Sequence, residues 1–344
     1  MFSEKPIISI IIPHWNGIDV LSECLDSLKQ TTYENKEIIV VDNASSDGSQ
    51  AWIKEHHPDI TLVENDENYG YAGGCNRGVP SAKGNWLLFL NNDTIQETDW
   101  LNHLADRVSE SEEIVALQPK IRNYYERNLF DYAGGAGGHI DLLCFPFTKG
   151  RIFLEQEEDL GQYNTRTDIF WASGTAIMVR KDDFESAGGF DETFFAHQEE
   201  IDLCWRLQLI GNRIVFEPNS IIYHKNAVSL PMHSLQKNYL NHRNSFFMLL
   251  TNYNLLLTLY LIPIRLALEF VAVIYALVKW DLRHFGAVFK SLFWLLTHPV
   301  LIFNKRRSVR KIRVLSDTEI LKKFYRGSIV FAHYIRGIKK YSDL

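Results

Sequence analysis

Continuous apolar runs that end abruptly in polar residues mark the first half of the chain. Residues 86–90 are Trp-Leu-Leu-Phe-Leu and lead into Asn91-Asn-Asp93, and residues 38–41 lead in the same way into Asp42. Strands that are buried on both faces of a parallel sheet are apolar throughout rather than alternating. Ligands of open α/β sheets bind beyond the carboxyl ends of such strands. This pattern predicts two carboxylates at one sheet edge, in a site that suits a polar ligand and a cation.

Strands and helices alternate along residues 7–118, which predicts a parallel sheet flanked by helices. Strands are expected at residues 7–12, 37–41, 60–63, 86–90 and 114–118, and helices at 20–28, 49–57 and 99–109. Residues 120–168 show no regular pattern, and a patternless stretch of this length is often functional. A strand at 169–180, a helix at 199–210 and short strands at 213–217 and 220–223 are expected to follow.

From residue 245 onward the composition changes. Residues 245–264 contain no charged residue, but Asn252 and Pro263 interrupt this run, and Arg265 and Glu269 follow it closely. A spanning helix needs about 20 mainly apolar residues, and charges near the bilayer centre are costly. The pattern therefore favours helices that lie in the membrane interface over helices that cross it. The alternative is a soluble helical domain that packs on the rest of the chain.

The charge distribution supports an anionic partner for the last part of the chain. The 344 residues carry a net charge of −6, yet residues 279–344 contain 15 Lys and Arg against 4 Asp and Glu. Neighbouring apolar segments make a membrane surface a better partner than nucleic acid. The four cysteines lie far apart without a CxxC pair, so neither a disulfide framework nor a zinc ribbon is indicated. Residues 7–12 are too short for a signal peptide, and we expect a cytoplasmic protein.

Two further polar groups offer the remaining chemistry. The acidic cluster Glu199-Glu200-Ile201-Asp202 begins a predicted helix, and His224 directly follows an apolar strand. With Asp93, they supply a carboxylate and an imidazole for a divalent ion and a separate carboxylate for a general base. Such a set would suit a nucleoside diphosphate leaving group, whose negative charge a bound ion stabilises. Taken singly, these residues would be a turn aspartate, acids at a helix start and a surface or core histidine.

Seven short motifs occur in a fixed order along the chain. They are Ile8-Ser-Ile-Ile-Ile-Pro-His-Trp-Asn-Gly17, Ile39-Val-Val-Asp-Asn-Ala-Ser-Ser-Asp-Gly48, Asn68-Tyr-Gly-Tyr-Ala-Gly-Gly-Cys-Asn-Arg-Gly78, Leu90-Asn-Asn-Asp-Thr94, Trp171-Ala-Ser-Gly174, Gly188-Gly-Phe-Asp-Glu192 and Glu199-Glu-Ile-Asp-Leu-Cys-Trp-Arg206. This series, with Tyr223-His224 after it, resembles the family 2 glycosyltransferases of GT-A fold, in particular their bacterial rhamnosyltransferase-like branch. The resemblance covers roughly residues 6–245, with a looser similarity at Asn241-His-Arg-Asn244.

The resemblance implies a fold class and a domain organisation. A GT-A fold is α/β and Rossmann-like, with a mostly parallel central sheet flanked by helices. Residues 1–120 would form its nucleotide-sugar-binding half, and residues 121–244 its acceptor-binding and catalytic half. Residues 245–344 would form a C-terminal helical, basic and membrane-associating extension.

The resemblance also implies a role for individual residues. The residues expected to bind the donor nucleotide are Pro13, Trp15, Asn16, Asp42, Asn43, Arg77, Asn91 and Asn92, with Asp42 accepting from the N–H of a pyrimidine ring. The expected metal ligands are Asp93 and His224, for Mg²⁺ or Mn²⁺. The expected base is Glu200, with Glu199 as its rival. The residues expected to face the sugar or acceptor are Trp171, Ser173, Gly174 and Asp202, although Trp171 would serve equally well as a core residue.

Two residues depart from the family pattern. Asn91 replaces the first acid of the family's DXD motif, and Glu200 stands where an Asp is usual. The implied activity is metal-dependent, inverting transfer of a sugar from a UDP- or dTDP-sugar to a hydroxyl of a glycan or lipid-linked acceptor. Surface polysaccharide synthesis at the inner face of the plasma membrane is the expected context.

Other functions stay open as alternatives. The departures at Asn91 and Glu200 suit an inactive GT-A-like scaffold that binds nucleotide or glycan. A nucleotidyltransferase would need a basic Gly-rich loop in place of Pro13-His-Trp-Asn-Gly17. A processive synthase would need several spanning helices and a QxxRW signature, and the sequence offers neither.

Overall fold

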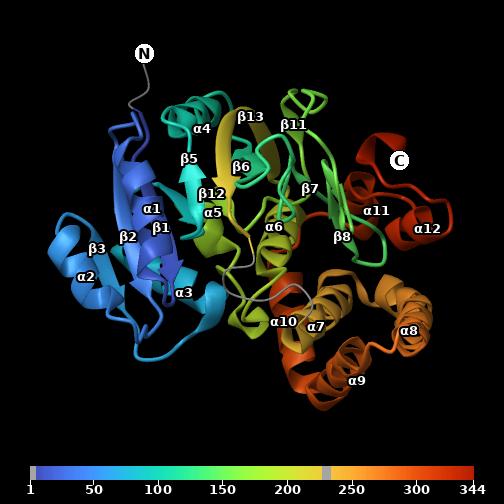
Figure 1. Ribbon diagram of the computed structural model, residues 1–344. Coiled ribbons are helices and arrows are strands. Elements are labelled where there is room, and N and C mark those ends of the chain that lie inside the picture. Colours follow the sequence, from blue (N-terminus) through green and yellow to red (C-terminus); the bar gives the residue numbers. More distant parts are fainter. Residues whose placement is uncertain (1–4, 227–233) are drawn as a thin grey trace.

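A mixed nine-stranded sheet forms the core of the computed structural model, which describes residues 5–226 and 234–344 (Figure 1). Its strand order is β11-β13-β6-β12-β4-β1-β2-β3, and β5 pairs with β13. The strands are β1 (Ile8–His14), β2 (Lys36–Asp42), β3 (Thr61–Glu64), β4 (Trp86–Leu90), β5 (Thr94–Gln96), β6 (Ile114–Asn123), β11 (Thr167–Asp168), β12 (Ala176–Arg180) and β13 (Arg213–His224).

The direction of the strands brings several carboxyl ends to one edge. Strands β1 to β4 run parallel, and β12 runs antiparallel to both β4 and β6. Because β13 is parallel to β6, it points the same way as β4. His14 is the register partner of Asp42 at this edge, and His224 ends β13 there. The expected mostly parallel sheet is therefore confirmed, with β12 antiparallel inside it and β5 and β11 antiparallel to β13.

Helices cover the sheet on both faces and precede the C-terminal region. They are α1 (Ile18–Lys29), α2 (Ser49–His56), α3 (Gly70–Gly78), α4 (Trp100–Val108), α5 (Lys181–Ser186) and α6 (Glu199–Ile210), with 3-10 turns η1 (Val79–Ser81) and η2 (Glu192–Phe194). In α1 the apolar positions recur at helical spacing, and Leu21, Cys24, Leu25 and Leu28 are buried. Such packing fixes the loops that follow β1, β2 and β4.

Three expectations about local structure need correction. Residues 120–168 contain a second, four-stranded antiparallel sheet of β7 (Gly138–Ile140), β8 (Pro146–Thr148), β9 (Arg151–Ile152) and β10 (Glu155–Gln156). The strand expected at 169–180 is regular only in β12, because residues 169–175 form a loop. The two short strands expected at 213–223 are one strand, β13, with an irregularity between Glu217 and Ile221.

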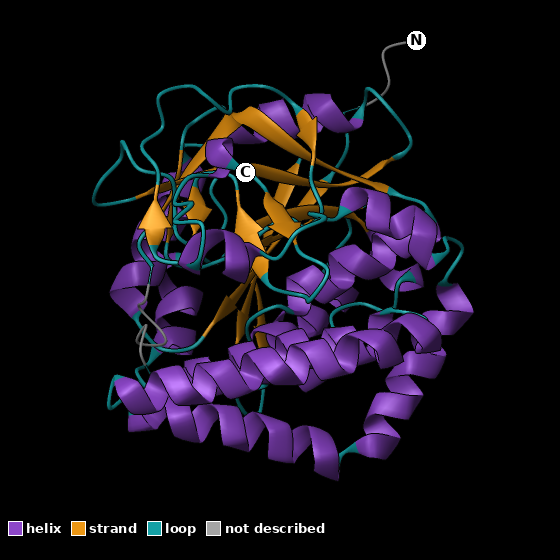
Figure 2. Cartoon of the chain, turned by 90° about the vertical axis from the view of Figure 1, so that its right-hand side faces the viewer, coloured by secondary structure: helices purple, strands orange, loops and turns teal. Residues whose placement is uncertain are grey.

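Long helices dominate the C-terminal region. They are α7 (Leu235–Asn252), α8 (Leu255–Val278), α9 (Leu282–Thr297) and α10 (Pro299–Ile312), followed by the short elements α11 (Asp317–Ile320), η3 (Leu321–Lys323), α12 (Ile329–Tyr334) and η4 (Tyr341–Asp343). Figure 2 shows the long helices gathered at one end of the molecule, beyond the strands. The helical region thus begins at residue 235, ten residues before the change in composition.

Helix α8 is apolar but carries an internal buried ion pair, and both partners of that pair also bond to other elements of the protein. It is the single helix among the described residues with the length and hydropathy of a membrane span, and α9 and α10 would qualify only as a pair bent by 74°. Arg265 and Glu269 of α8 are both buried, with Arg265 Nη2 2.7 Å from Glu269 Oε1. Arg265 also donates to the carbonyl of Leu143 at 2.6 Å. One side of α8 therefore packs on the protein through charged groups.

Candidate active site

The loops after β1 and β2 are bonded to each other at the sheet edge. The amide N–H of Ser46 donates to Asn16 Oδ1 at 2.9 Å, and the N–H of Gly17 donates to Asp47 Oδ2 at 2.6 Å. Asn16 has a positive φ of 56°, which this bonding supports. The two loops form one rigid wall beside the end of β2.

Asp42 lies fully buried in this wall with one oxygen unused. Its Oδ2 accepts from the N–H of Ser45 at 3.0 Å and from Gln50 Nε2 at 2.6 Å. Its Oδ1 has no hydrogen-bond partner among the described residues. A buried acceptor without a partner is costly and rare, so it points to a donor on a ligand. This geometry suits the expected contact with a ring N–H.

The other residues expected at the nucleotide are partly committed to protein contacts. Asn43 Nδ2 donates to the carbonyl of Gly70 at 3.0 Å, and Arg77 Nη1 lies 3.0 Å from Glu192 Oε1. Asn92 Nδ2 lies 2.9 Å from His14 Nδ1. Trp15, two residues after Pro13, keeps 51% of its surface exposed. Of these residues, Trp15 is the one with a large free surface for a base or sugar.

His224 lies between two carboxylates at the same edge. Its Nε2 is 3.1 Å from Asp93 Oδ1, and its Nδ1 is 3.0 Å from Asp131 Oδ1. Burial lowers the pKa of His224, but Asp93 and Asp131 outweigh burial and raise it to about 10. Burial would raise the pKa of Asp93, yet the charge of His224 holds it below its usual range. Asn91 Nδ2 lies 3.4 Å from His224 Nε2, which joins the expected Asn91-Asn-Asp93 motif to His224.

Asp131 is a member of this site that the sequence did not reveal. It is fully buried, its N–H donates to the carbonyl of Ile121 at 3.0 Å, and Asn226 Nδ2 donates to its Oδ2. It precedes the Gly-rich segment that begins at Gly134, which was the only available signal. Because it contacts the ring nitrogen that faces away from Asp93, it orients the imidazole.

Asp93 and His224 could hold a divalent cation if that cation displaced the proton that His224 carries near neutral pH. No group of three or more His, Cys, Asp or Glu with metal-binding spacing occurs in residues 5–226 and 234–344. Mg²⁺ takes only one or two protein ligands beside phosphate and water, and two ligands at right angles are about 3 Å apart. The separation of 3.1 Å between Asp93 Oδ1 and His224 Nε2 matches that value. Asp93 Oδ1 is buried, and Asp131 holds the second nitrogen of His224 as outer-shell carboxylates do.

Glu199 and Glu200 begin α6 with raised pKa values. Burial and the charge of Glu200 raise the pKa of Glu199 well above its usual value. Burial raises the pKa of Glu200 to about 7, although nearby backbone N–H groups, including that of Gly174, lower it. Glu199 is buried whereas Glu200 is half-buried. Near neutral pH, Glu199 therefore keeps its proton while Glu200 can lose its own, which favours Glu200 as the base.

The loop before β12 connects this acidic pair with the sheet edge that carries Asn91 and Asp93. The carbonyl of Thr175 accepts from the N–H of Asn91 at 2.9 Å, one residue after Gly174. Ser173 donates from its N–H to Gln118 at 2.8 Å and from its Oγ to Ala133. The expected Ser173 and Gly174 therefore shape the backbone between Glu200 and Asn91.

Trp171 is a core residue. It is 3% exposed, and its Nε1 donates to the carbonyl of His139 at 2.8 Å. A Cβ on Gly138 would lie 2.1 Å from its ring, so the indole packs directly on that glycine. The core alternative for Trp171 is therefore favoured over stacking on a sugar.

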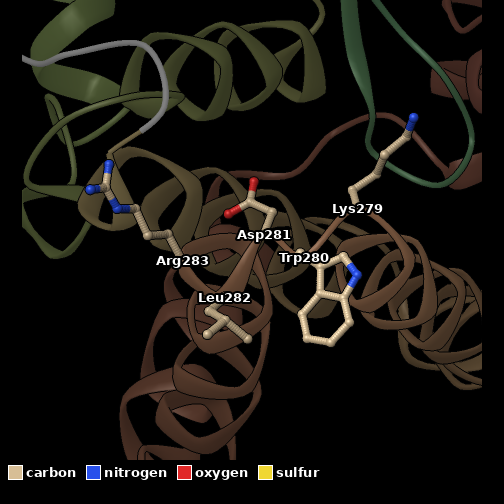
Figure 3. A pocket seen from close by; sticks show the side chains of 5 residues that line it. All are labelled: Lys279, Trp280, Asp281, Leu282 and Arg283. Atoms are coloured by element: carbon tan, nitrogen blue, oxygen red, sulfur yellow. The ribbon is translucent and has the colours of Figure 1, made fainter.

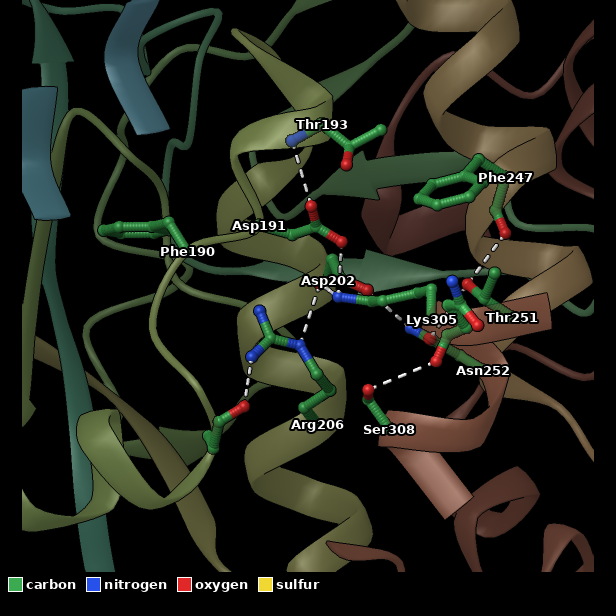
Figure 4. Close-up of polar contacts among 12 residues, drawn as sticks. Phe190, Asp191, Thr193, Asp202, Arg206, Phe247, Thr251, Asn252, Lys305 and Ser308 are labelled. Atoms are coloured by element: carbon green, nitrogen blue, oxygen red, sulfur yellow. Dashed lines mark hydrogen bonds and ion pairs between the residues drawn. The ribbon is translucent and has the colours of Figure 1, made fainter. Parts of the chain in front are cut away.

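Asp202 is enclosed by contacts that leave no room for an acceptor (Figure 4). Its Oδ2 is 2.8 Å from Arg206 Nε and 2.9 Å from Lys305 Nζ, and its Oδ1 accepts from Asn252 at 3.0 Å. Burial would raise the pKa of Asp202, but Arg206 and Lys305 lower it to about 2. These contacts make Asp202 structural and correct the expectation that it faces the sugar or acceptor.

The family of the chain follows from a comparison with known proteins. The model of "Glycosyl transferase family 2" matches residues 9–188, more than half of the 344 residues. This chain belongs to glycosyltransferase family 2. The match spans the ends of β1, β2 and β4, and hence Asp42 and Asp93.

Two curated relatives and a solved structure illustrate the family and fold. The glycosyltransferase is 30% identical over 229 residues to the O-antigen biosynthesis protein RfbC of Myxococcus xanthus, covering 64% of this chain and 18% of that protein. It is 26% identical over 225 residues to an N-acetylglucosaminyl-diphospho-decaprenol L-rhamnosyltransferase of Mycobacterium tuberculosis, covering 61% and 73%. The crystal structure of GalNAc-T7 with UDP, GalNAc and Mn²⁺ superposes with a TM-score of 0.55 at 16% identity, covering 70% of this chain and 48% of that chain. The likeness to GalNAc-T7 concerns the fold alone, and the expected GT-A class with a C-terminal helical region is confirmed.

Proposed function

We propose that this glycosyltransferase moves a sugar from a UDP- or dTDP-sugar to a hydroxyl group with inversion at the anomeric carbon. The observation that carries the proposal is the separation of two acidic groups: a carboxylate–imidazole pair at the sheet edge and another carboxylate at the start of α6. Asp93 pairs with His224, while Glu200 stands apart at the start of α6 with a pKa of about 7. One set of groups is suited to the diphosphate and the other to a general base.

The chain's own residues account for each part of the transfer. Asp42 Oδ1 accepts from the base of the nucleotide, which fixes the donor at the ends of β1 and β2. Glu200 takes the proton of the acceptor hydroxyl. The oxygen of that hydroxyl attacks the anomeric carbon, and the nucleotide departs from the opposite face. A single base without an enzymic nucleophile gives inversion, because only one displacement occurs.

A divalent cation would be held by Asp93 and His224. When bound, Mg²⁺ or Mn²⁺ stabilises the negative charge that develops on the departing diphosphate. Asp131 keeps the imidazole of His224 in position for this contact. The crystal structure of GalNAc-T7, which shares the fold, holds Mn²⁺ together with UDP, and this supports a divalent cation as the cofactor.

The names of the relatives support a cell-surface glycan as the product. One relative is named for O-antigen biosynthesis and the other for transfer to a diphospho-decaprenol carrier. We infer that the acceptor is a glycan or a lipid-linked sugar in surface polysaccharide synthesis.

Metal-dependent hydrolysis or transfer tests the proposed function directly. In a screen of nucleotide sugars with Mn²⁺, we expect release of UDP or dTDP from one donor class and none with EDTA. Asp93→Ala should weaken Mn²⁺-dependent UDP binding at least about tenfold by calorimetry, because the metal loses a ligand. An Asp66→Ala variant, whose carboxyl group lies on the surface and bonds Tyr69, serves as the control. Nucleotide binding without any sugar turnover would instead favour the inactive scaffold.

We further propose that the helical region rests on an anionic membrane. Several large apolar side chains of α8, α9 and their connection are exposed, among them Leu256, Tyr260, Phe270, Trp280, Phe293 and Leu296. Exposed apolar surface of this extent indicates an interaction site. Figure 3 shows Trp280 and Leu282 directed to one side of the α8–α9 turn, opposite in this view to the charged ends of Lys279 and Arg283. Aromatic and cationic residues side by side are typical of interfacial anchors.

Vesicle binding tests the membrane proposal. The protein should sediment with vesicles that contain anionic lipid, and added salt should weaken binding because it screens surface charge. Trp280→Ala, which removes a side chain that is 86% exposed, should reduce binding several-fold. Leu160→Ala, at a residue 79% exposed in the catalytic half, is the matched control. Equal binding by both variants, or none to anionic vesicles, would contradict the proposal.

A further inference from the structure

The segment that leads into Glu199 and Glu200 has an unusual backbone. Phe195 has φ 63° and ψ −60°, and the N–H of Ala196 donates to the carbonyl of Phe194 at 2.7 Å. This is a γ-turn of the positive-φ form, which is rare and strained. His197 and Gln198 also have positive φ values, of 67° and 72°. Non-glycine residues rarely adopt this region, and they persist only where the surroundings hold them.

Helix α3 holds the turn from the donor-binding half. The N–H groups of Tyr71 and Ala72 both donate to the carbonyl of Phe195, at 2.8 and 3.4 Å. A Cβ at Gly70 would lie 2.3 Å from that same oxygen, so only glycine allows this approach. The first glycine of α3, which belongs to the Gly-rich motif, thus supports the γ-turn.

Helix α7 holds the same segment through hydrogen bonds from two of its side chains. Arg243 Nη2 donates to the carbonyls of Thr193 and Phe194, at 2.8 and 2.9 Å. Asn244 Nδ2 donates to the carbonyls of Ala196 and His197, at 3.1 and 2.6 Å. Arg243 Nε also donates to Asn244 Oδ1 at 2.7 Å, so the two side chains form one unit.

Contacts within the helical region fix the pair Arg243 and Asn244, which we call the clamp. Arg243 and Asn244 are both buried, and the guanidinium of Arg243 lies 4.8 Å from the ring centre of Trp294 in α9. Four carbonyls of the strained segment therefore depend on two side chains of α7. The N–H groups of Arg243 and Asn244 that bond these carbonyls hold the backbone in place and are not available to a ligand.

We propose that Arg243 and Asn244 are positioning residues that hold the strained 193–198 segment and thereby place Glu200 for proton transfer. The inference rests on the proposed function, because it takes Glu200 as the base. The clamp gives the C-terminal helices a part in catalysis that is separate from any membrane contact. Loss of the clamp relaxes the segment, and a small displacement of a catalytic group is enough to lower turnover about a hundredfold.

Asn244→Asp is the sharpest test, because it preserves shape and the acceptor for Arg243 but removes both donors to the segment. We expect kcat to fall about a hundredfold while the donor KM stays within about threefold. The kcat of Arg243→Lys, which keeps the charge, should fall less than the kcat of Arg243→Ala. Gln236→Ala, at an exposed residue of α7, is the matched control. Thermal unfolding and Mn²⁺-UDP binding establish that each variant is folded.

The pH profile separates positioning from a general loss of structure. The titratable groups that face Glu200 are Glu199 and Cys204 on α6 and Tyr71 on α3, and none of them is altered in these variants. Asn244→Asp adds a carboxylate of its own, which would pair with Arg243 and whose charge would raise the pKa of Glu200, opposite to the shift expected here. Water admitted by a loosened segment should move the acid limb of kcat from near pH 7 toward the ordinary value for glutamate, about 4.3. A folded Asn244→Asp enzyme with unchanged kcat, or with reduced kcat and an acid limb still near pH 7, would overturn the proposal. Retained turnover in Glu200→Gln would overturn the assignment of Glu200 as the base. If Glu200→Gln is inactive but Asn244→Asp keeps its turnover, only the positioning role of Arg243 and Asn244 is overturned.

Discussion

Glu200→Gln is expected to lower kcat about a thousandfold and to leave the affinity for the donor nucleotide nearly unchanged. General base catalysis contributes about 10² to 10⁴ in rate, and glutamine keeps the shape of glutamate without accepting a proton. In the unmodified enzyme, kcat should rise with pH through about 7, because Glu200 must lose its proton to act. Steady-state kinetics with the donor identified in the screen measures both effects.

Glu199→Gln is the matched control for this prediction. Because Glu199 is buried and already keeps its proton near neutral pH, its replacement should lower kcat by less than about tenfold. Near-normal turnover in both variants would refute the base assignment. Retention of the anomeric configuration, measured by NMR of the product, would refute the inverting mechanism as a whole.

The main sheet could be predicted because its signals are local. Strands β1, β2 and β4 each contain a continuous apolar run, and these runs are largely buried. The second sheet could not be predicted, because its strands have only two or three residues and show no periodicity. The loop at 169–175 was mistaken for a strand because the packing of Trp171 on Gly138 depends on a distant segment.

The residues of the site also differ in whether the sequence could predict them. Asp93 and His224 were predictable as a pair because a family pattern marks both, and the parallel course of β4 and β13 brings them together. Asp131 lies in an irregular stretch, and its role depends on a hydrogen bond to a residue 93 positions away. Asp202 looked like part of an acidic catalytic cluster, yet its partners Asn252 and Lys305 come from the helical region. Sequence position alone cannot separate a buried structural acid from a catalytic one.

Asp202→Asn is expected to destabilise the protein by about 3 kcal/mol. Breaking a buried ion pair on one side leaves uncompensated charge, at a typical cost of about 3–5 kcal/mol. Arg206 would lose its carboxylate, whereas Lys305 would keep Asp191 at 2.7 Å, so we expect the lower end of that range. Urea unfolding near pH 7, with the slope compared between variants, measures the difference.

The stabilisation that Asp202 contributes is expected to depend on pH. The pKa of Asp202 is about 2 in the fold and about 3.9 in an unfolded chain, so its stabilisation is fully present above about pH 4 and is lost as the pH falls toward 2. The difference between the original protein and Asp202→Asn should therefore shrink as the pH is lowered through this window. Asp26→Ala, which removes a pair exposed on both sides, should cost less than about 1 kcal/mol and is the control. An Asp202→Asn protein as stable as the control would show that α10 is not anchored to α6 through this carboxylate.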